Sequence, residues 1–287
     1  MPGREAADEE MPLLPNRNPK LSQPESLLAR CRRHLTANVS RDWADVILIS
    51  FYFVTGLLDS ASISVWGSFV SMQTGTNYTP SSPSRILLTR AGNTVYIGLG
   101  LAAPAASTRW IKSGVSLLAF CIGSFLFSRF HRLFSPQHRW VLCASFTVQL
   151  LLTAAAAGMV TAAGTPAEME HIGWQVLTPI ALLAFQSCGQ AVASRVLKYN
   201  ALTSVVLTSI YCDLFSDAEL FALQNVERNR RTGAPLFLLL GAFVGGKFAN
   251  SSFGVAGALW TATGLKAVAV LVWLVWPAEV VEDSDEV

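Results

Sequence analysis

Charge is scarce in this sequence. Only 14% of the 287 residues are Asp, Glu, Lys or Arg, whereas 52% are hydrophobic. A soluble domain averages roughly 25% charged residues, so the shortfall indicates a chain embedded in lipid. The basic residues also fall in short segments between apolar runs, which is not the pattern of a nucleic-acid-binding surface. The expected partner is therefore the lipid bilayer, and no nucleic-acid partner is expected.

Signatures of disulfide, metal and enzyme chemistry are missing as well. The five cysteines are odd in number and form no C-x-x-C pair, and the four histidines lie outside the apolar runs. The sequence contains no G-x-S-x-G, H-E-x-x-H, P-loop or dinucleotide-binding fingerprint. The first 40 residues also lack an apolar core followed by a small-residue cleavage site, so no signal peptide is expected. We therefore expect no cofactor, no metal site and no enzymatic activity.

What the sequence does contain is a series of long apolar runs. A helix needs roughly 20 apolar residues to cross a bilayer. Six runs approach or exceed that length: 44–70, 112–130, 141–163, 173–193, 235–254 and 256–276. Two further runs, 93–106 and 201–215, are shorter. The pattern predicts an all-α, polytopic membrane protein with about six transmembrane helices and two short or re-entrant segments.

The order of these runs indicates an internal repeat. Long, short, long and long runs follow one another twice, although residue identity between the halves is weak. If the short runs do not cross, the presumed inner loops carry 12 basic residues and the outer loops 4; if they cross, the split is 9 to 7. The positive-inside tendency favours six spans, two inverted halves and both termini in the cytoplasm. We expect a plasma-membrane or vacuolar-membrane location.

The segments around the membrane domain differ in composition. Residues 1–24 are rich in Pro, Glu, Asn and Arg and are expected to be disordered. Residues 25–42 place apolar side chains at helical spacing opposite arginines, which suits either a helix on the membrane surface or a basic juxtamembrane flank. The membrane domain then occupies 43–276, and 277–287 form an acidic tail. Within the domain, Arg228–Arg231 is interpreted as a cytoplasmic loop at the membrane surface.

Residues 76–92 do not fit their surroundings. They bring prolines, serines and two arginines into an otherwise apolar region. Without them, Gly75 would join Asn93 and give the sequence Met-Gln-Thr-Gly-Asn-Thr-Val-Tyr. Either these residues are a retained intron in the gene model, or they form a genuine extracytoplasmic loop. A single mature transcript that encodes all 17 residues would exclude the intron.

With that block joined, the chain resembles a known family. The motifs that carry the resemblance are Gly56-x-x-Asp59-Ser60, Met72-x-Thr74-Gly75 joined to Asn93-Thr94, Ala119-Phe120-x-x-Gly123, Phe185-Gln186-x-x-Gly189-Gln190, Val206-Leu207-Thr208-Ser209 and Leu240-Gly241-Ala242-x-x-Gly245. They are similar to the YoaK-like family of multi-pass membrane proteins, domain-of-unknown-function family 1275, and to its fungal branch. The resemblance covers about residues 43–276 and implies a membrane protein without an assigned substrate.

Asp59 lies about halfway along the first apolar run. An ionised carboxylate at membrane depth is costly unless it is paired, protonated or in contact with water, so it is a candidate functional group. Lys247 and Lys266, in the fifth and sixth runs, are its expected partners. Lys266 lies about ten residues from the nearer end of its run and could partly snorkel towards the interface. The alternative role for Asp59 is a polar contact between helices.

Interrupted polar segments occur at matching places in the two halves, which points to a transporter-like central site. In the first half they contain Thr74, Gly75, Asn93 and Thr94, and in the second half the corresponding residues are Gln186, Gln190 and Thr208. Gln186 and Gln190 are four residues apart and share a helix face. These groups are expected to line a path for a small polar solute or a cation, or else to serve only helix packing.

The leading hypothesis is therefore a transporter or permease for an unidentified small polar or ionic solute, with Asp59 and Lys247 as coupling groups. The alternative is a non-transporting membrane scaffold or assembly factor. Small residues at Gly241 and Gly245 allow close helix approach and suggest a homo-oligomer through that face.

Overall fold

The computed structural model describes residues 26–73, 76–77, 90–104, 107–163, 172–199, 202 and 207–279. Six of its helices are long and apolar enough to cross a membrane. They are α2 (Ala44–Trp66), α4 (Arg109–Leu133), α5 (Arg139–Ala163), α6 (Trp174–Val196), α8 (Val226–Ala249) and α9 (Gly254–Val275). The predicted all-α polytopic fold is thereby confirmed. The short runs form α3 (Asn93–Ala102) and α7 (Leu207–Phe215), which at about 1.5 Å per residue are too short to span a bilayer.

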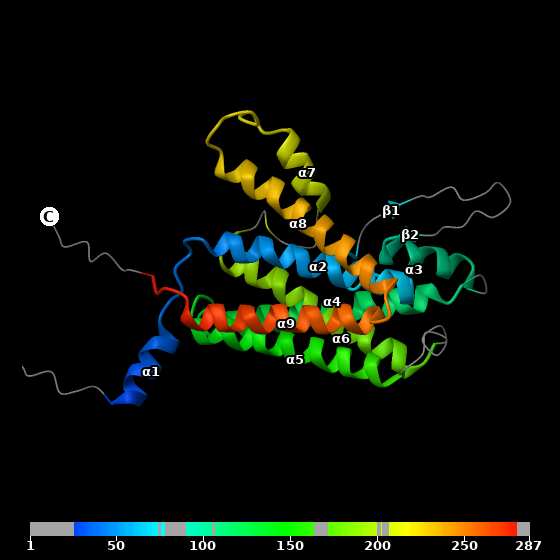
Figure 1. Cartoon of the computed structure of the whole chain (residues 1–287), viewed down its shortest axis with the longest axis horizontal. Helices are drawn as coiled ribbons and strands as arrows, with labels where there is room; N and C mark the ends of the chain where they lie inside the picture. Colours follow the sequence, from blue (N-terminus) through cyan, green and yellow to red (C-terminus); the bar gives the residue numbers. More distant parts are fainter. Residues whose placement is uncertain are drawn as a thin grey trace, which may run out of the picture.

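The ends of these helices fix their directions. Val39 N–H donates to the Gln137 carbonyl at 3.0 Å, and Glu279 N–H donates to the Asn38 carbonyl at 2.9 Å. The Tyr199 hydroxyl, just after α6, donates to the Arg41 carbonyl at 2.8 Å. These contacts bring the start of α2, the α4–α5 turn and the ends of α6 and α9 together at one end of the bundle (Figure 1). We call it the basic end, because it contains the loops that are richer in Arg and Lys.

An ion pair adds α8 to the same end. The Arg230 guanidinium, in the second turn of α8, lies 2.7 Å from the Asp45 carboxylate in the first turn of α2. Helices α2, α5 and α8 therefore start at the basic end, whereas α4, α6 and α9 finish there. Six successive helices thus alternate in direction, and both ends of the described membrane domain lie on one side.

The packing reveals an inverted two-fold arrangement of the halves. The most extensive contacts are α2 with α8, α4 with α6 and α5 with α9. Exchanging α2 with α6, α4 with α8 and α5 with α9 turns the α2–α8 contact into the α6–α4 contact and leaves α5–α9 unchanged. The contacts α5–α6 and α9–α2 also correspond, as do α3–α4 and α7–α8. Exchanged helices run in opposite directions, so the halves are inverted repeats around an axis between α2, α6, α5 and α9.

Glycines allow the close approach of α2 and α8. A Cβ at Gly56 would overlap the backbone of α8 at Leu238, and a Cβ at Gly241 would overlap the Phe53 carbonyl of α2. Gly245 faces the Ser60 hydroxyl in the same way. Gly241 and Gly245 are buried by this intramolecular contact. The face predicted to form a homo-oligomer is therefore occupied by the chain's own α2.

The anomalous segment leaves and re-enters the fold at one place. Its ends form a short antiparallel pair, β1 (Thr76–Asn77) with β2 (Arg90–Ala91). Beyond this pair, Thr94 N–H donates to the Gln73 carbonyl at 3.2 Å. The residues on either side of the segment thus lie next to each other, as the joined motif would require.

The start of α8 differs from its prediction. The helix begins at Val226, not at residue 235, because the Asn225 side chain caps it by accepting a hydrogen bond from Arg228 N–H at 2.9 Å. The segment Arg228–Arg231 is consequently helical, and its interpretation as a loop is wrong. The predicted helix after residue 25 is present as α1 (Leu27–Thr36), which is capped by Ser26 and buries none of its side chains.

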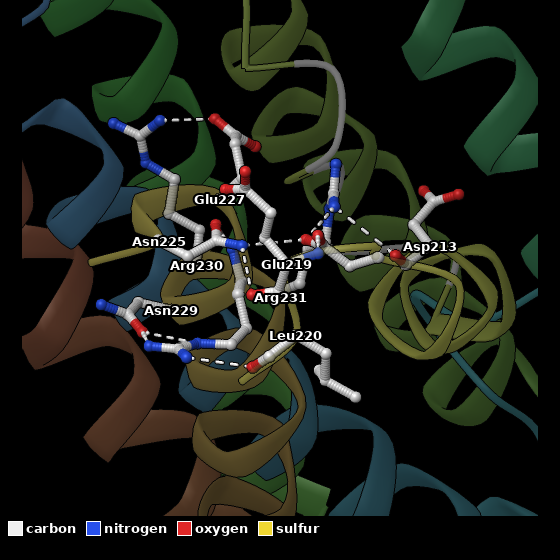
Figure 2. A network of polar contacts seen from close by, with 10 residues as sticks. Asp213, Glu219, Leu220, Asn225, Glu227, Asn229, Arg230 and Arg231 are labelled. Carbon is white, nitrogen blue, oxygen red and sulfur yellow. Dashed lines mark hydrogen bonds and ion pairs between the residues drawn. The ribbon is translucent and has the colours of Figure 1, made fainter. Parts of the chain in front are cut away.

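A polar network holds the α7–α8 connection against α8 (Figure 2). Asp217 accepts hydrogen bonds from Glu219 N–H at 2.9 Å and from the Asn225 side chain at 3.2 Å, and it pairs with Arg231 at 3.2 Å. The Glu219 N–H, the Asn225 amide and the nearby Arg231 lower the pKa of the Asp217 carboxyl. The connection also carries Phe221 and Leu223, whose side chains are almost fully exposed. At the basic end, such side chains suit contact with a membrane surface.

Candidate functional site

Asp59 stabilises the break that follows α2. Its carboxylate accepts hydrogen bonds from three successive backbone N–H groups, those of Val70 at 2.9 Å, Ser71 at 2.8 Å and Met72 at 3.1 Å. The side chain is buried within the bundle. Backbone donors inside a membrane domain need such partners, because no water is available to satisfy them. The carboxylate therefore acts as an internal cap for an irregular segment.

Asn93 connects the same segment to α3 and α4. Its amide nitrogen donates to the Phe69 carbonyl and the Gln73 side chain, each at 2.8 Å, and its oxygen accepts from the Ser68 hydroxyl at 3.1 Å. The Ser116 hydroxyl of α4 donates to the Phe69 carbonyl at 2.7 Å. Asn93 is fully buried, and both atoms of its amide have partners. We call Asp59, Asn93 and their partners the polar break.

The other predicted members of the first-half site are placed as follows. Thr94 lies in the first turn of α3, where both its N–H and its hydroxyl donate to the Gln73 carbonyl. Thr74 and Gly75 lie outside the described residues. Thr208, their counterpart in the second half, is exposed on α7.

The predicted pairing of Asp59 with a lysine is wrong. Lys247 is exposed on α8, and its ammonium lies 5.4 Å from the centre of the Phe243 ring. Lys266 does not snorkel, since its side chain is fully buried. In the part of the chain that the structure describes, neither lysine comes within 4.0 Å of the Asp59 carboxylate. Asp59, Lys247 and Lys266 lie in the predicted spans, but their side chains contact other neighbours and not one another.

Lys266 instead forms a second cluster at the centre of the bundle. Its ammonium donates to the Gln149 side-chain oxygen of α5 at 3.0 Å. The same nitrogen lies 5.6 Å from the centre of the Phe51 ring on α2, which gives a cation–π contact. Gln149 is fully buried as well. The cation is thus held by one amide oxygen and one aromatic face.

Helix α6 completes this cluster, which we call the central cluster: Phe51, Thr55, Gln149, Gln186, Gln190 and Lys266. The Thr55 hydroxyl lies 3.2 Å from the Gln190 side-chain oxygen and 3.0 Å from the Phe51 carbonyl, and it can donate its single hydrogen to only one of them. Gly189 lies against Gln149, because a Cβ at this position would be 2.6 Å from the Gln149 Nε2. Gln186 precedes Gln190 by one turn of α6 and is fully buried. Of the predicted site residues, the structure therefore places Gln190 beside Thr55 and Gln186 one turn before Gln190. Between them, the Ser187 hydroxyl lies 3.0 Å from the Val70 carbonyl oxygen, so α6 also contacts the polar break.

The central cluster lies on the axis that relates the two halves. Thr55, Gln149, Gln186 and Lys266 each lie near the middle of their helix, and these helices are the four that surround the axis. Inverted-repeat transporters bind their solutes at this place, near the midplane of the bilayer. Sequence reasoning missed Gln149, although a single amide in the middle of an apolar run was a usable signal.

An apolar groove of about 360 Å³ lies beside the central cluster, between α2, α8 and α9. Phe51, Phe53 and Val54 line it from α2, and Leu265 and Ala269 line it from α9. Phe51 therefore separates this groove from the Lys266 ammonium. As for metals, the described residues contain no group of three or more His, Cys, Asp or Glu side chains that could bind an ion.

Neither the curated proteins nor the solved structures give a match to this chain. A family model described as "Protein of unknown function (DUF1275)" matches residues 89–272. The matched stretch includes the α5, α6 and α9 residues of the central cluster and begins after Asp59. Because this match extends over more than half of the chain, the protein belongs to the DUF1275 family.

Proposed function

We propose that the protein is a transporter or permease for a small polar or ionic solute. The observation that carries this proposal is a buried polar cluster on the axis between two inverted halves. A fold that needed only stability would fill this position with apolar side chains, since buried polar groups and charges cost free energy unless they are fully paired. Alternating access needs a central site that two equivalent halves can expose in turn.

In this proposal the predicted site residues divide into two groups. Gln186 and Gln190 line the solute site together with Gln149 and Lys266. Asp59 and Asn93 fix the irregular segment between α2 and α3, which gives the first half a defined break. The basic end faces the cytoplasm of the plasma membrane or the vacuole, in line with the positive-inside tendency. The protein acts as a carrier and not as an enzyme.

A membrane scaffold is the second candidate. The polar break favours it, because every oxygen of Asp59 and both amide atoms of Asn93 are already hydrogen-bonded within the protein. Polar groups that are satisfied in this way serve helix packing and do not require a solute as a hydrogen-bond partner.

Profiling of metabolites and ions in cells that lack the protein tests the proposal. Wild type, Lys266→Met and Lys247→Met are restored at equal abundance. Transport predicts that one solute pool shifts in the deletion strain, that wild type and Lys247→Met correct it, and that Lys266→Met does not. If no pool moves, the scaffold function replaces the transport proposal. If a pool moves and Lys266→Met corrects it fully, the solute path does not depend on Lys266.

A further inference from the structure

The charge of Lys266 has no acidic counterpart in the described part of the protein. No carboxylate there lies within 4.0 Å of its ammonium. Asp59 is eight residues from Phe51 along α2, a rise of about 12 Å, and its oxygens are engaged by backbone N–H groups. One amide oxygen and one aromatic face offset only part of the cost of burying a cation. The buried amine of Lys266 therefore lacks a counterion among the described residues.

Several buried polar atoms in and beside the central cluster have no hydrogen-bond partner in the described part of the chain. The Nε2 atoms of Gln149, Gln186 and Gln190 are buried and have no partner among the described residues. The Tyr52 hydroxyl, three residues before Thr55 on the same side of α2, is equally unsatisfied. Among the unsatisfied atoms of these four side chains, only the Gln186 oxygen and the Tyr52 oxygen can accept. Buried donors without partners are rare and costly in native proteins.

We propose that the central cluster is a binding site for a small oxoanion, with simple carboxylates included in this class. The ammonium of Lys266 would provide the neutralising charge, and the glutamine amides would donate hydrogen bonds to the anion's oxygens. This inference rests on the proposed transport function in so far as it names the class of solute carried.

A cation, or water alone, suits the site less well than an oxoanion does. A cation would meet the ammonium charge and a set of N–H groups, so it would find repulsion and few acceptors. Ordered water would satisfy the amides but would leave the buried charge without a counterion. An oxoanion meets both needs, because its oxygens form charge-assisted hydrogen bonds with amide and ammonium donors.

Equilibrium binding to the full chain in lipid nanodiscs tests the inference, with radiolabelled acetate and inorganic phosphate as the probes. Saturable binding of at least one probe at one site per chain is expected. The Lys266→Met variant removes the charge and retains a side chain of similar length, so binding should weaken by at least about tenfold. The matched control is Lys247→Met, which removes the exposed lysine of α8 and should change the affinity less than about twofold.

Gln186→Leu provides a second variant that does not depend on the folding of Lys266→Met. Both amide atoms of Gln186 lack partners, so a purely structural role predicts that leucine leaves or raises stability and has no effect on binding. The oxoanion site predicts weaker probe binding without loss of stability. Absence of binding to wild type, or wild-type affinity in both Lys266→Met and Gln186→Leu, would overturn the inference.

Flux into proteoliposomes separates this inference from the transport proposal. If a probe binds in a Lys266-dependent way but is not carried across the bilayer, the anion site stands and the transport proposal fails. If the protein instead carries a neutral or cationic solute at the same rate in wild type and Lys266→Met, transport stands and the anion site is overturned.

Discussion

Among the ionisable side chains of the transmembrane helices, Asp59, Lys247 and Lys266 meet three different environments. Asp59 accepts hydrogen bonds from backbone N–H groups, Lys247 is exposed on the side of α8, and Lys266 is buried against α2 and α5. An ionisable group inside a membrane is costly, so its surroundings indicate what offsets that cost. For Asp59, three backbone N–H groups offset much of that cost. For Lys266, one amide oxygen and one aromatic ring offset less of it, and this makes Lys266 the stronger candidate for a ligand contact.

Asp59→Asn tests the structural role of the carboxylate. The amide would place an NH₂ group among backbone donors and lose at least one charge-assisted hydrogen bond, so the free energy of unfolding should fall by about 2 kcal/mol. Reversible unfolding in detergent measures this change. In the control, Asp45→Asn weakens only the partly exposed pair with Arg230 and should cost less than about 1 kcal/mol. A variant that is as stable as wild type but inactive in flux would return Asp59 to the coupling role.

The residues of the site were predictable only in part. Asp59, Asn93, Gln186 and Gln190 could be selected from the sequence because polar groups in apolar runs are rare and costly. Their partners could not be selected, because contacts between helices depend on how each helix is rotated about its axis. The carboxylate of Asp59 meets backbone N–H groups, which leave no trace in the side-chain pattern. The sequence favours Lys247 over Lys266 as a functional residue, because the distance of Lys266 from the end of its run allows snorkelling.

At the scale of elements, the α2–α8 contact depends on glycines at defined positions. Gly245 lies against Ser60 and the Leu57 carbonyl, whereas the neighbouring Gly246 has no atom within 4 Å of an added Cβ. Gly245→Ala should therefore force the helices apart and destabilise the protein by about 1–3 kcal/mol. Gly246→Ala should stabilise it slightly, because alanine favours the helix by up to about 1 kcal/mol.

Thermal unfolding of the two variants in detergent gives the comparison. Equal effects at both positions would show that α2 and α8 are not in close contact. Loss of self-association in Gly245→Ala without any loss of stability would instead support the oligomer interface predicted from the sequence.

The segment between β1 and β2 provides a second prediction at this scale. Deletion of residues 76–92 should leave the fold intact, because Gln73 already accepts hydrogen bonds from Thr94, just after the deleted segment. Shortening a connection whose ends are adjacent also lowers the entropic cost of closing it, which favours the folded state. The expected result is a monodisperse protein at least as stable as wild type, as judged by size-exclusion chromatography and thermal unfolding. Aggregation of the deletion variant would show that the segment is an integral part of the fold.

For the whole molecule, the hydropathy of the sequence predicts the membrane spans but not how they pack against one another. The six spans and the order of long and short runs follow from helix length and composition, which the bilayer imposes on any chain. The inverted halves could be anticipated from the odd number of spans in each half. The pairing of α2 with α8 and of α4 with α6 could not, because small residues such as Gly56 and Gly123 allow close approach without naming the partner helix.

The alternating directions of the helices lead to a final prediction, namely on which side of the membrane each end of the bundle lies. The native Cys31 and the exposed Ser135 of the α4–α5 turn lie towards the basic end, whereas Ser251 of the α8–α9 turn lies at the opposite end. In a background without other cysteines, a membrane-impermeant maleimide on intact cells should label Ser251→Cys. It should label Cys31 and Ser135→Cys only after permeabilisation, because the positive-inside tendency places the basic end in the cytoplasm. Eight spans would place Ser135 on the side opposite Cys31, so labelling of Ser135→Cys alongside Ser251→Cys would overturn the six-span fold.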